Sequence, residues 1–259
     1  MLLVKWGRAM AINHRDRTMI ISKEAVTLIH TDTHIAGIPE AKLLDNLTDE
    51  EKERADRFRF DNDRQNFVLR RGLLRQLLGD TLSIAPSLIR FDSTPVGKPF
   101  IAYPENSGLS FNLSHSGRQI VYAFSRHPET GIDIERIRTV DDIDQLALKY
   151  FSAEEYAIIV NLPSWEKNKA FIRIWSIKEA LIKACGCPLE YGLAAFDVAT
   201  QYRMNRFLVP FGHDRAITCV TPVFDYICGF ATALAIQLDA SEPLDLRRYS
   251  LQNGEYIEL

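Results

Sequence analysis

The sequence has few cysteines and no long apolar run. Its four cysteines, Cys185, Cys187, Cys219 and Cys228, form no CxxC pair and stand near no zinc-type histidine doublet. Neither a disulfide framework nor a zinc site is therefore expected, and the thiols are predicted to be reduced. No apolar segment approaches the roughly 18 residues needed to span a bilayer, and charges interrupt residues 1–21. We expect a cytoplasmic protein that neither crosses nor binds a membrane.

The sequence also lacks an excess of positive charge. Its 259 residues carry a formal net charge of −3, with 46% hydrophobic and 25% charged residues. This composition is that of an ordinary folded protein and argues against disordered and coiled-coil classes. Arginines cluster between Arg54 and Arg75, but the negative net charge and the limited interleaving of aromatic residues exclude nucleic acid as the expected partner.

The first half of the chain alternates strand and helix patterns. A strand is predicted at residues 24–29, and Thr48 is predicted to cap a helix that continues to Phe60. A second helix should run from Phe67 to Leu78 and end at Gly79. Further elements of this half are strands at 88–92, 109–113 and 120–124, and a turn at 94–99.

The second half begins with a predicted linker at 125–131 and a strand at 132–135. A helix is expected at 140–150, and a short helix should follow Ser152, with Glu155 at its third position. A long helix is predicted at 168–185, ended by Gly186. The first twenty residues and the tail after Leu238 match no motif.

A faint internal repeat indicates two similar halves. The segment Arg71–Gly79 aligns with Lys178–Gly186, and a Phe-Asp pair follows each of them. Chance similarity between amphipathic helices is the alternative. The repeat predicts an α+β pseudo-dimer, with an N-terminal half at 20–127, a C-terminal half at 128–259 and the active site in the cleft between them.

Two carboxylates alternate with isoleucines in Gly131-Ile-Asp-Ile-Glu135. In a strand, Asp133 and Glu135 project from one face while the isoleucines enter the core. Two adjacent carboxylates repel one another unless a cation lies between them, which favours a hard metal ion with oxygen ligands. The alternative is a solvated strand face beside Arg136 and Arg138.

A second candidate group lies on the long helix. Trp175, Glu179 and Lys183 are four residues apart, so one helix face presents an aromatic ring, a carboxylate and an ammonium group. An exposed Glu-to-Lys pair that stabilises the helix slightly is the alternative.

Three further segments offer donors that suit phosphate oxygens. Gly97-Lys98-Pro99 is a rigid turn that presents a cation. Asn112-Leu-Ser-His-Ser116 ends a strand with polar groups that include Ser114 and His115. Arginines line the third segment, at Arg64, Arg70, Arg71 and Arg75. Taken separately, these segments could be a surface turn, a satisfied polar cluster and a solvated basic helix.

The order of these segments carries a resemblance to a known family. The order runs from the arginine-rich helix through Gly97–Pro99, Phe111–Ser116, Gly131–Glu135 and Phe151–Tyr156 to Trp175–Lys183. It resembles the surfactin-type 4′-phosphopantetheinyl transferases over roughly Thr48 to Gly192. The resemblance implies a pseudo-dimer that transfers the phosphopantetheine arm of coenzyme A to a carrier-protein serine and releases adenosine 3′,5′-bisphosphate.

The resemblance also implies roles for individual residues. Asp133, Glu135 and Glu179 would hold Mg²⁺, with Mn²⁺ as an alternative. Glu179 or a metal-bound water would take the serine proton, and Lys183 would stabilise the pyrophosphate. The residues that would contact coenzyme A are Arg71, Gly97, Lys98, Pro99, Asn112, Ser114, His115, Asp133, Glu179 and Lys183. In the loosely spaced arginine helix, Arg64 or Arg70 could take the place of Arg71.

The implied partners are acyl or peptidyl carrier proteins, whose acidic helix would be steered by a local basic patch. Apolar residues near Pro163 would make further contacts, and the enzyme would act as a monomer. A coenzyme A or nucleotide sensor without catalysis is the competing hypothesis, although Asp133, Glu135, Glu179 and Lys183 are all present. The sequence leaves open whether the carrier serves fatty acid, polyketide, nonribosomal peptide or lysine synthesis.

Overall fold

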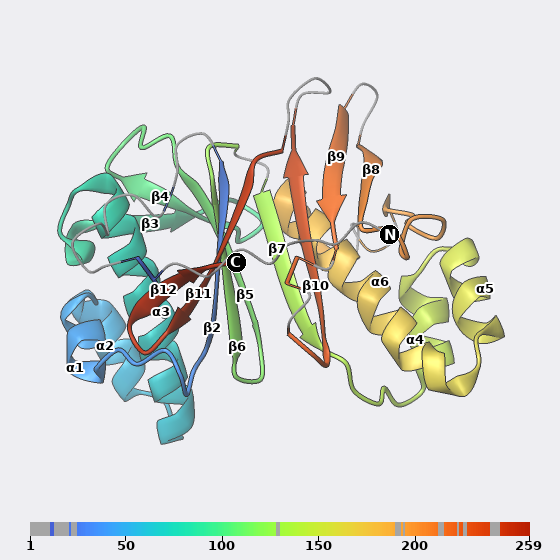
Figure 1. Cartoon of the computed structure of the whole chain (residues 1–259), viewed down its shortest axis with the longest axis horizontal. Coiled ribbons are helices and arrows are strands. Elements are labelled where there is room, and N and C mark those ends of the chain that lie inside the picture. The colour runs from blue at the N-terminus through green and yellow to red at the C-terminus, as the bar shows by residue number, and fades with distance from the viewer. Residues whose placement is uncertain are drawn as a thin grey trace. The chain divides into compact units, whose positions relative to one another are not determined.

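The computed structural model describes residues 11–12, 21, 25–127, 130–189, 193, 195–211, 215–221, 223–224, 227–238 and 244–259. It divides into two compact units, Met1–Ile89 with Asp245–Leu259, and Arg90–Leu244. Both units combine helices and strands in separate runs along the chain (Figure 1), which confirms the predicted α+β class. The predicted division into halves at 20–127 and 128–259 rests on the sequence repeat, not on these compact units, and it stays a prediction.

The first unit combines helices from the start of the chain with strands from both of its ends. Its helices are α1 (Glu40–Asp45), α2 (Asp49–Asp56), α3 (Asp61–Leu82) and the 3₁₀ helix η2 (Pro86–Leu88). Its strands are β1 (Ala11–Ile12), β2 (Val26–Asp32), β11 (Leu246–Gln252) and β12 (Glu255–Glu258). They follow the order β1-β12-β11-β2, and β11 is parallel to β2. The tail after Leu238, which matched no motif, therefore supplies two strands.

The helices of the first unit confirm one predicted boundary and correct another. Thr48 caps α2 in a reciprocal capping box with Glu51, as the sequence indicated. The prediction that Gly79 ends the next helix is wrong, because α3 continues to Leu82 and ends at Ser83 in the left-handed conformation. A Cβ atom on Gly79 would lie 2.9 Å from the carbonyl oxygen of Ile84. The glycine thus allows the chain after α3 to pack closely, rather than stopping the helix.

The second unit combines helices with strands that pair in separate groups, as far as its residues are described. The strands are β3 (Arg90–Ser93), β4 (Pro99–Tyr103), β5 (Ser110–Ser116), β6 (Gln119–Ser125), β7 (Thr130–Arg136), β8 (Arg206–Phe211), β9 (Arg215–Val220) and β10 (Phe230–Gln237). The helices are α4 (Ile143–Tyr150), α5 (Ala153–Asn161) and α6 (Ser164–Cys185). β3 pairs with β4 and β5 with β6, while four strands form a sheet in the order β7-β10-β9-β8.

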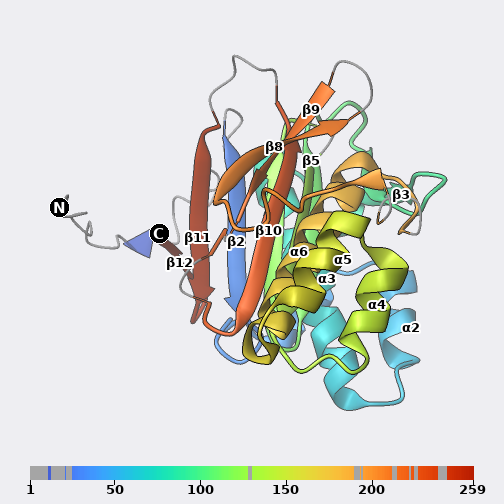
Figure 2. The same cartoon turned by 90° about the vertical axis from the view of Figure 1, so that its right-hand side faces the viewer.

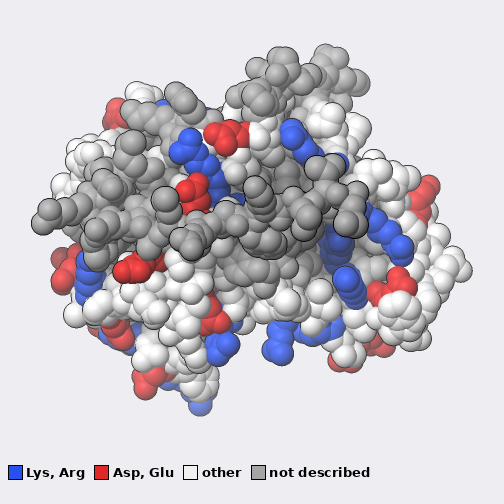
Figure 3. All heavy atoms as spheres, viewed as in Figure 1, with Lys and Arg blue, Asp and Glu red and all other residues white. Residues whose placement is uncertain are grey.

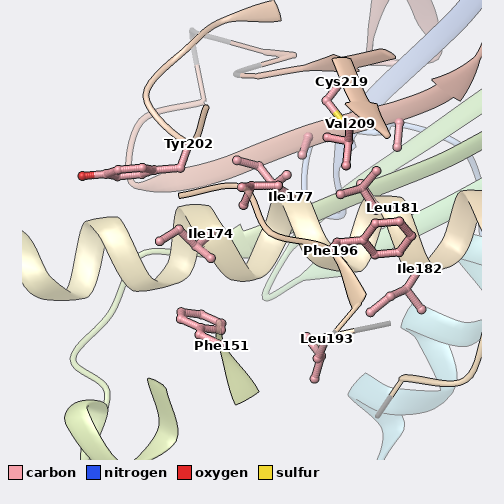
Figure 4. Packing of buried hydrophobic residues seen from close by; sticks show 14 of the residues in the cluster. Phe151, Ile174, Ile177, Leu181, Ile182, Leu193, Phe196, Tyr202, Val209 and Cys219 are labelled. Atoms are coloured by element: carbon pink, nitrogen blue, oxygen red, sulfur yellow. The ribbon is translucent and has the colours of Figure 1, made fainter. Parts of the chain in front are cut away.

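Helix α6 packs on β7 and β10, and its apolar face enters the core (Figures 1 and 2). Figure 4 shows Ile177 and Leu181 of α6 pointing toward Val209 and Cys219, with Phe196 beside Leu181. Burial raises the pKa of the Cys219 thiol well above its ordinary value. The core therefore holds α6 firmly against the sheet that carries Asp133 and Glu135.

A glycine sets the distance between α6 and β7. A Cβ atom on Gly131 would lie 2.1 Å from the carbonyl oxygen of Ala180 and 2.4 Å from the backbone nitrogen of Ala184. Both are backbone atoms that cannot move aside cheaply. Only glycine permits this approach, which brings the last turns of α6 next to the strand that contains Asp133.

Several predicted boundaries shift by a few residues. The expected linker at 125–131 is shorter, because β6 includes Ser125 and β7 begins at Thr130, while residues 128–129 lie outside the described part of the chain. Helix α6 begins at Ser164 rather than at residue 168, and Gly186 ends it with a φ of 62°, as predicted. Among the described residues, no helix has the length and hydropathy needed to cross a bilayer.

Candidate active site

The centre of the candidate site is Asp133 on β7, whose side chain is only 2% exposed. One oxygen, Oδ1, accepts hydrogen bonds from Ser114 Oγ at 2.9 Å and from Lys183 Nζ at 2.7 Å. Lys183 Nζ also donates to Ser114 Oγ at 3.2 Å. The other oxygen, Oδ2, is buried and has no partner in the described structure. Three segments predicted separately from the sequence therefore meet at one carboxylate.

Side chains of β5 connect this strand to β7. Asn112 Oδ1 accepts a hydrogen bond from the backbone nitrogen of Ile132 at 2.9 Å, and Ser116 Oγ donates to Glu135 at 3.0 Å. Ser114 contacts Asp133 between these two positions. Successive side chains of a β-strand point to opposite faces, so the three residues of β5 that contact β7 are spaced two apart. Ser116 was missed as a site residue, although it has the same spacing as Asn112 and Ser114.

Glu179 reaches the same region from α6. Its Oε2 lies 4.0 Å from Lys183 Nζ, one helical turn later. Burial raises the pKa of Glu179, and the charges of Asp133 and Glu135 raise it further, against the lowering effect of Lys183. Burial and Asp133 likewise raise the pKa of Glu135. Three carboxylates thus lie close enough to repel one another, with Lys183 as a cation among them.

The geometry of this group is not that of a preformed metal site. Among the described residues, no set of three or more His, Cys, Asp or Glu side chains is arranged to hold a metal ion. Lys183 instead occupies one oxygen of Asp133. The predicted assignment of Asp133, Glu135 and Glu179 as metal ligands therefore stays a prediction.

Lys98 follows the predicted turn, in which Gly97 has a φ of 86°. Lys98 Nζ donates to the carbonyl oxygens of Ala184 at 3.0 Å and Thr130 at 3.3 Å. These bonds connect the turn to the end of α6 and the start of β7. A pocket of about 460 Å³ adjoins the turn and is lined by Lys98, Pro99 and Gly186, among others.

His115 and Arg71 do not join the contacts around Asp133 that the structure describes. His115 is exposed, and strand alternation places it on the face of β5 opposite to Ser114. Arg71 lies in the first unit, where its Nε is 3.2 Å from Glu51. Their roles toward coenzyme A stay predictions, as do those of Gly97, Lys98 and Pro99.

Two more arginines of the predicted phosphate-binding helix, Arg75 and Arg64, have partners within the first unit. Arg75 is buried, pairs with Glu51 at 2.6 Å and donates to the carbonyl oxygens of Pro86 and Ile89. Its role there is structural, since these acceptors satisfy most of its donors. Arg64 pairs with Glu40 and Asp56.

An aromatic pocket adjoins Glu135. It has a volume of about 260 Å³, and its lining includes Glu135, Tyr150, Phe171 and Trp175. Trp175 stacks on Phe171 at 6.1 Å and meets Tyr150 edge to face at the same distance. The sequence predicted the wall formed by Trp175 but missed Tyr150 and Phe171, although Phe171 continues the four-residue spacing of Trp175 and Glu179.

A buried ion pair supports the helix just before Glu179. Lys178 Nζ lies 2.6 Å from Glu155 Oε2, and both side chains are fully buried. Lys178 also donates to the carbonyl oxygen of Leu193 at 2.6 Å. The other carboxylate oxygen accepts from the backbone nitrogen of Val198 at 2.8 Å. The pair thereby connects α5, α6 and the segment after α6. Sequence reasoning identified Glu155 only as a capping residue.

Comparisons with known proteins agree on one family. Residues 129–231 match the family model described as the 4′-phosphopantetheinyl transferase superfamily, and residues 41–127 match the model described as 4′-phosphopantetheinyl transferase, N-terminal. The chain is 38% identical over 170 residues to the 4′-phosphopantetheinyl transferase HetI of Nostoc, covering 62% of this chain and 71% of that protein. It is 31% identical over 170 residues to the 4′-phosphopantetheinyl transferase Sfp of Bacillus subtilis, covering 66% and 74%.

Proposed function

Because the chain belongs to the 4′-phosphopantetheinyl transferase family, we propose that it transfers the 4′-phosphopantetheine arm of coenzyme A to a serine of an apo acyl or peptidyl carrier protein. The products are the holo carrier protein and adenosine 3′,5′-bisphosphate. The observation that carries this proposal is the contact of Ser114 and Lys183 with the buried Asp133, beside Glu135 and Glu179.

The carboxylates of this site fit a divalent cation by their chemistry. Asp133 Oδ2 is buried without a partner among the described residues, and an unsatisfied buried carboxylate oxygen is costly. Burial, and after it the neighbouring carboxylates, raises the pKa values of Glu135 and Glu179, so a cation at this place would favour their charged forms. Asp133, Glu135 and Glu179 would hold Mg²⁺, or alternatively Mn²⁺. When bound, the ion would supply positive charge to the pyrophosphate of coenzyme A.

The chain's own residues would move one proton and stabilise one leaving group. The serine oxygen forms a bond to the phosphorus that carries the pantetheine arm, and the pyrophosphate bond to that phosphorus breaks. Glu179 takes the serine proton as the general base, and burial raises its pKa above the ordinary value for a carboxyl group. Lys183 donates hydrogen bonds to the oxygens of the leaving phosphate.

The contacts with coenzyme A divide into polar and apolar parts. Lys98, Ser114, His115 and Arg71 are the proposed donors to its phosphates and adenine. The pantetheine arm is uncharged and flexible, and the aromatic pocket beside Glu135 offers apolar walls next to the reacting groups.

The carrier protein would dock on the second unit near the start of α6. Trp165 is 80% exposed there, two residues after Pro163, and Lys169 and Arg203 lie close to it. Lys and Arg side chains, with Asp and Glu among them, are visible on the right-hand part of Figure 3, where α4, α5 and α6 lie in Figure 1. An exposed indole beside cations suits a partner that presents an acidic helix with an apolar residue.

We further propose that the enzyme acts as a monomer in the cytoplasm. The internal repeat supports a single chain that supplies both halves of the fold. The cysteines described by the structure are all free thiols, which suits a reducing compartment.

The direct test combines the protein with apo carrier protein, coenzyme A and Mg²⁺. Mass spectrometry should show the carrier gaining the mass of one phosphopantetheine arm, and no gain across several carriers would contradict the proposal. Glu179→Gln should abolish transfer while its circular dichroism spectrum stays unchanged. If the wild type binds coenzyme A without transferring the arm to any carrier, the sensor hypothesis is favoured.

A further inference from the structure

A separate pocket of the second unit adjoins the first half of α6. It has a volume of about 240 Å³ and shares no lining residue with the contacts around Asp133. Helix α6 contributes Lys169, Arg173 and Ser176, which lie at spacings of four and three residues and so share one helix face. The remaining lining consists of Ile137, Thr221, Phe224 and residues 227–232.

Two polar atoms of this pocket's lining residues lack partners. Arg173 Nε and Ser176 Oγ are both buried, and neither has a hydrogen-bond partner in the described structure. The residue Ser176 is only 1% exposed. The guanidinium of Arg173 is held at its other end, where Nη2 donates to the carbonyl oxygen of Met204 at 3.2 Å. A buried donor without an acceptor costs about 1–3 kcal/mol, so a ligand oxygen that reached either donor through a shift of its side chain would stabilise the protein.

The positive charge at this place is only partly compensated. Glu166 is the nearby carboxylate, and it pairs with Arg203 at 3.4 Å, while no described carboxylate is among the charges that shift the pKa of Arg173. Burial lowers the pKa of the Arg173 guanidinium, and the positive charge of Arg203 lowers it further. A guanidinium held in such a setting binds multi-oxygen anions well, because several donors can meet one ligand.

We propose that this pocket binds a phosphate group, either as inorganic phosphate or as a small phosphomonoester. Lys169 and Arg173 supply the charge, and Ser176 supplies a hydroxyl donor. The volume excludes a ligand as large as coenzyme A and accommodates a phosphate with a small substituent. The apolar residues Ile137 and Phe230 would contact that substituent. The pocket shares no residue with the contacts around Asp133, but it shares Lys169 with the proposed carrier-docking surface.

Thermal unfolding of the full-length, metal-free protein tests this proposal. The midpoint temperature is measured against sodium phosphate and, in a second series, glycerol phosphate, with sodium chloride keeping the ionic strength constant. Wild type should show a saturable rise with at least one of the two. Comparison of the two series tells whether the free anion or the ester binds more tightly.

The variants locate the binding site. Arg173→Met and Lys169→Met should each raise the apparent Kd at least tenfold; Lys169 is exposed, so its replacement leaves the fold intact. Lys167→Met removes one charge from the same helix outside the pocket and should retain the wild-type Kd. A wild-type midpoint that does not respond to either ligand would overturn the proposal. So would an effect that Lys98→Met abolishes and Arg173→Met retains, because phosphate would then bind at the coenzyme A donors.

Discussion

Replacing Lys178 by methionine should destabilise the protein far more than replacing any solvent-accessible lysine of α6. Methionine keeps the length of the side chain but removes its charge and its hydrogen bonds. Lys178 Nζ lies 2.6 Å from Glu155 Oε2 and 2.6 Å from the carbonyl oxygen of Leu193, and both members of the ion pair are fully buried. The substitution therefore leaves Glu155 as a buried carboxylate without its counter-charge.

The size of the effect follows from that burial. Breaking a buried ion pair by removing one partner costs about 3–5 kcal/mol, against a total stability of about 5–15 kcal/mol for a typical protein. Glu155 keeps two backbone donors, from Ser152 at 2.9 Å and Val198 at 2.8 Å, which places the loss nearer about 3 kcal/mol. Glu155→Gln should cost a similar amount, since burial already lowers the pKa of Lys178 and the remaining ammonium would lack a counter-charge.

Urea unfolding followed by circular dichroism measures these losses. With a slope of about 3 kcal/mol per molar urea, a loss of about 3 kcal/mol shifts the midpoint by about 1 M. The double variant Lys178→Met with Glu155→Gln should lose less than the sum of the single variants, because no unpaired buried charge remains.

The matched control is Lys167→Met on the same helix. Lys167 pairs with Asp144 at 2.8 Å, but Asp144 is half exposed, and such a pair contributes about 0–1 kcal/mol. If Lys178→Met loses no more stability than Lys167→Met, the reasoning from burial is refuted. Strictly additive losses in the double variant would refute the account of the ion pair.

Three further predictions concern the candidate site. Glu179→Gln should abolish transfer and yet raise the melting temperature of the metal-free protein by about 1–3 °C at pH 7. A raised carboxyl pKa means that the folded state favours the protonated form of Glu179. The charged form therefore destabilises the folded protein above that pKa, and the stability increases as the pH falls toward it. An unchanged or lower melting temperature of the variant would contradict this. Gly131→Ala should lower the free energy of unfolding in urea by at least about 3 kcal/mol and should lower the rate of transfer, because its Cβ would lie 2.1 Å from a backbone atom of α6. A variant with wild-type stability and wild-type transfer would count against the packing argument. Trp165→Ala should raise the KM for carrier protein by about tenfold while the KM for coenzyme A stays constant; equal changes in both would exclude a docking role.

Much of the site could be predicted because its signals are local. A strand with carboxylates at alternate positions, as in Asp133 and Glu135, has both on one face wherever the strand lies. A helix with Glu179 and Lys183 four residues apart likewise presents them together. The start of α2 at Thr48 and the end of α6 at Gly186 could be predicted for the same reason, since helix caps depend on neighbouring residues.

Other features depend on residues far apart in the sequence. Gly79 has the pattern of a helix end, but it lies inside α3, where the absence of a side chain leaves room for the backbone of Ile84. Arg75 has the pattern of a phosphate donor, but it is buried against Glu51 and two carbonyl groups. Periodicity cannot distinguish these cases, because the partner is supplied by another segment.

The sequence by itself determined the α+β class, the family and the residue types that converge on Asp133. It could not determine what those residues contact. Only the tertiary structure decided that Ser116 joins Glu135, that Lys98 bonds the end of α6 and that Lys178 is neutralised by Glu155. The physical reason is that propensity, capping and periodicity act within a few residues, whereas ion pairs and close backbone packing form only when distant segments meet.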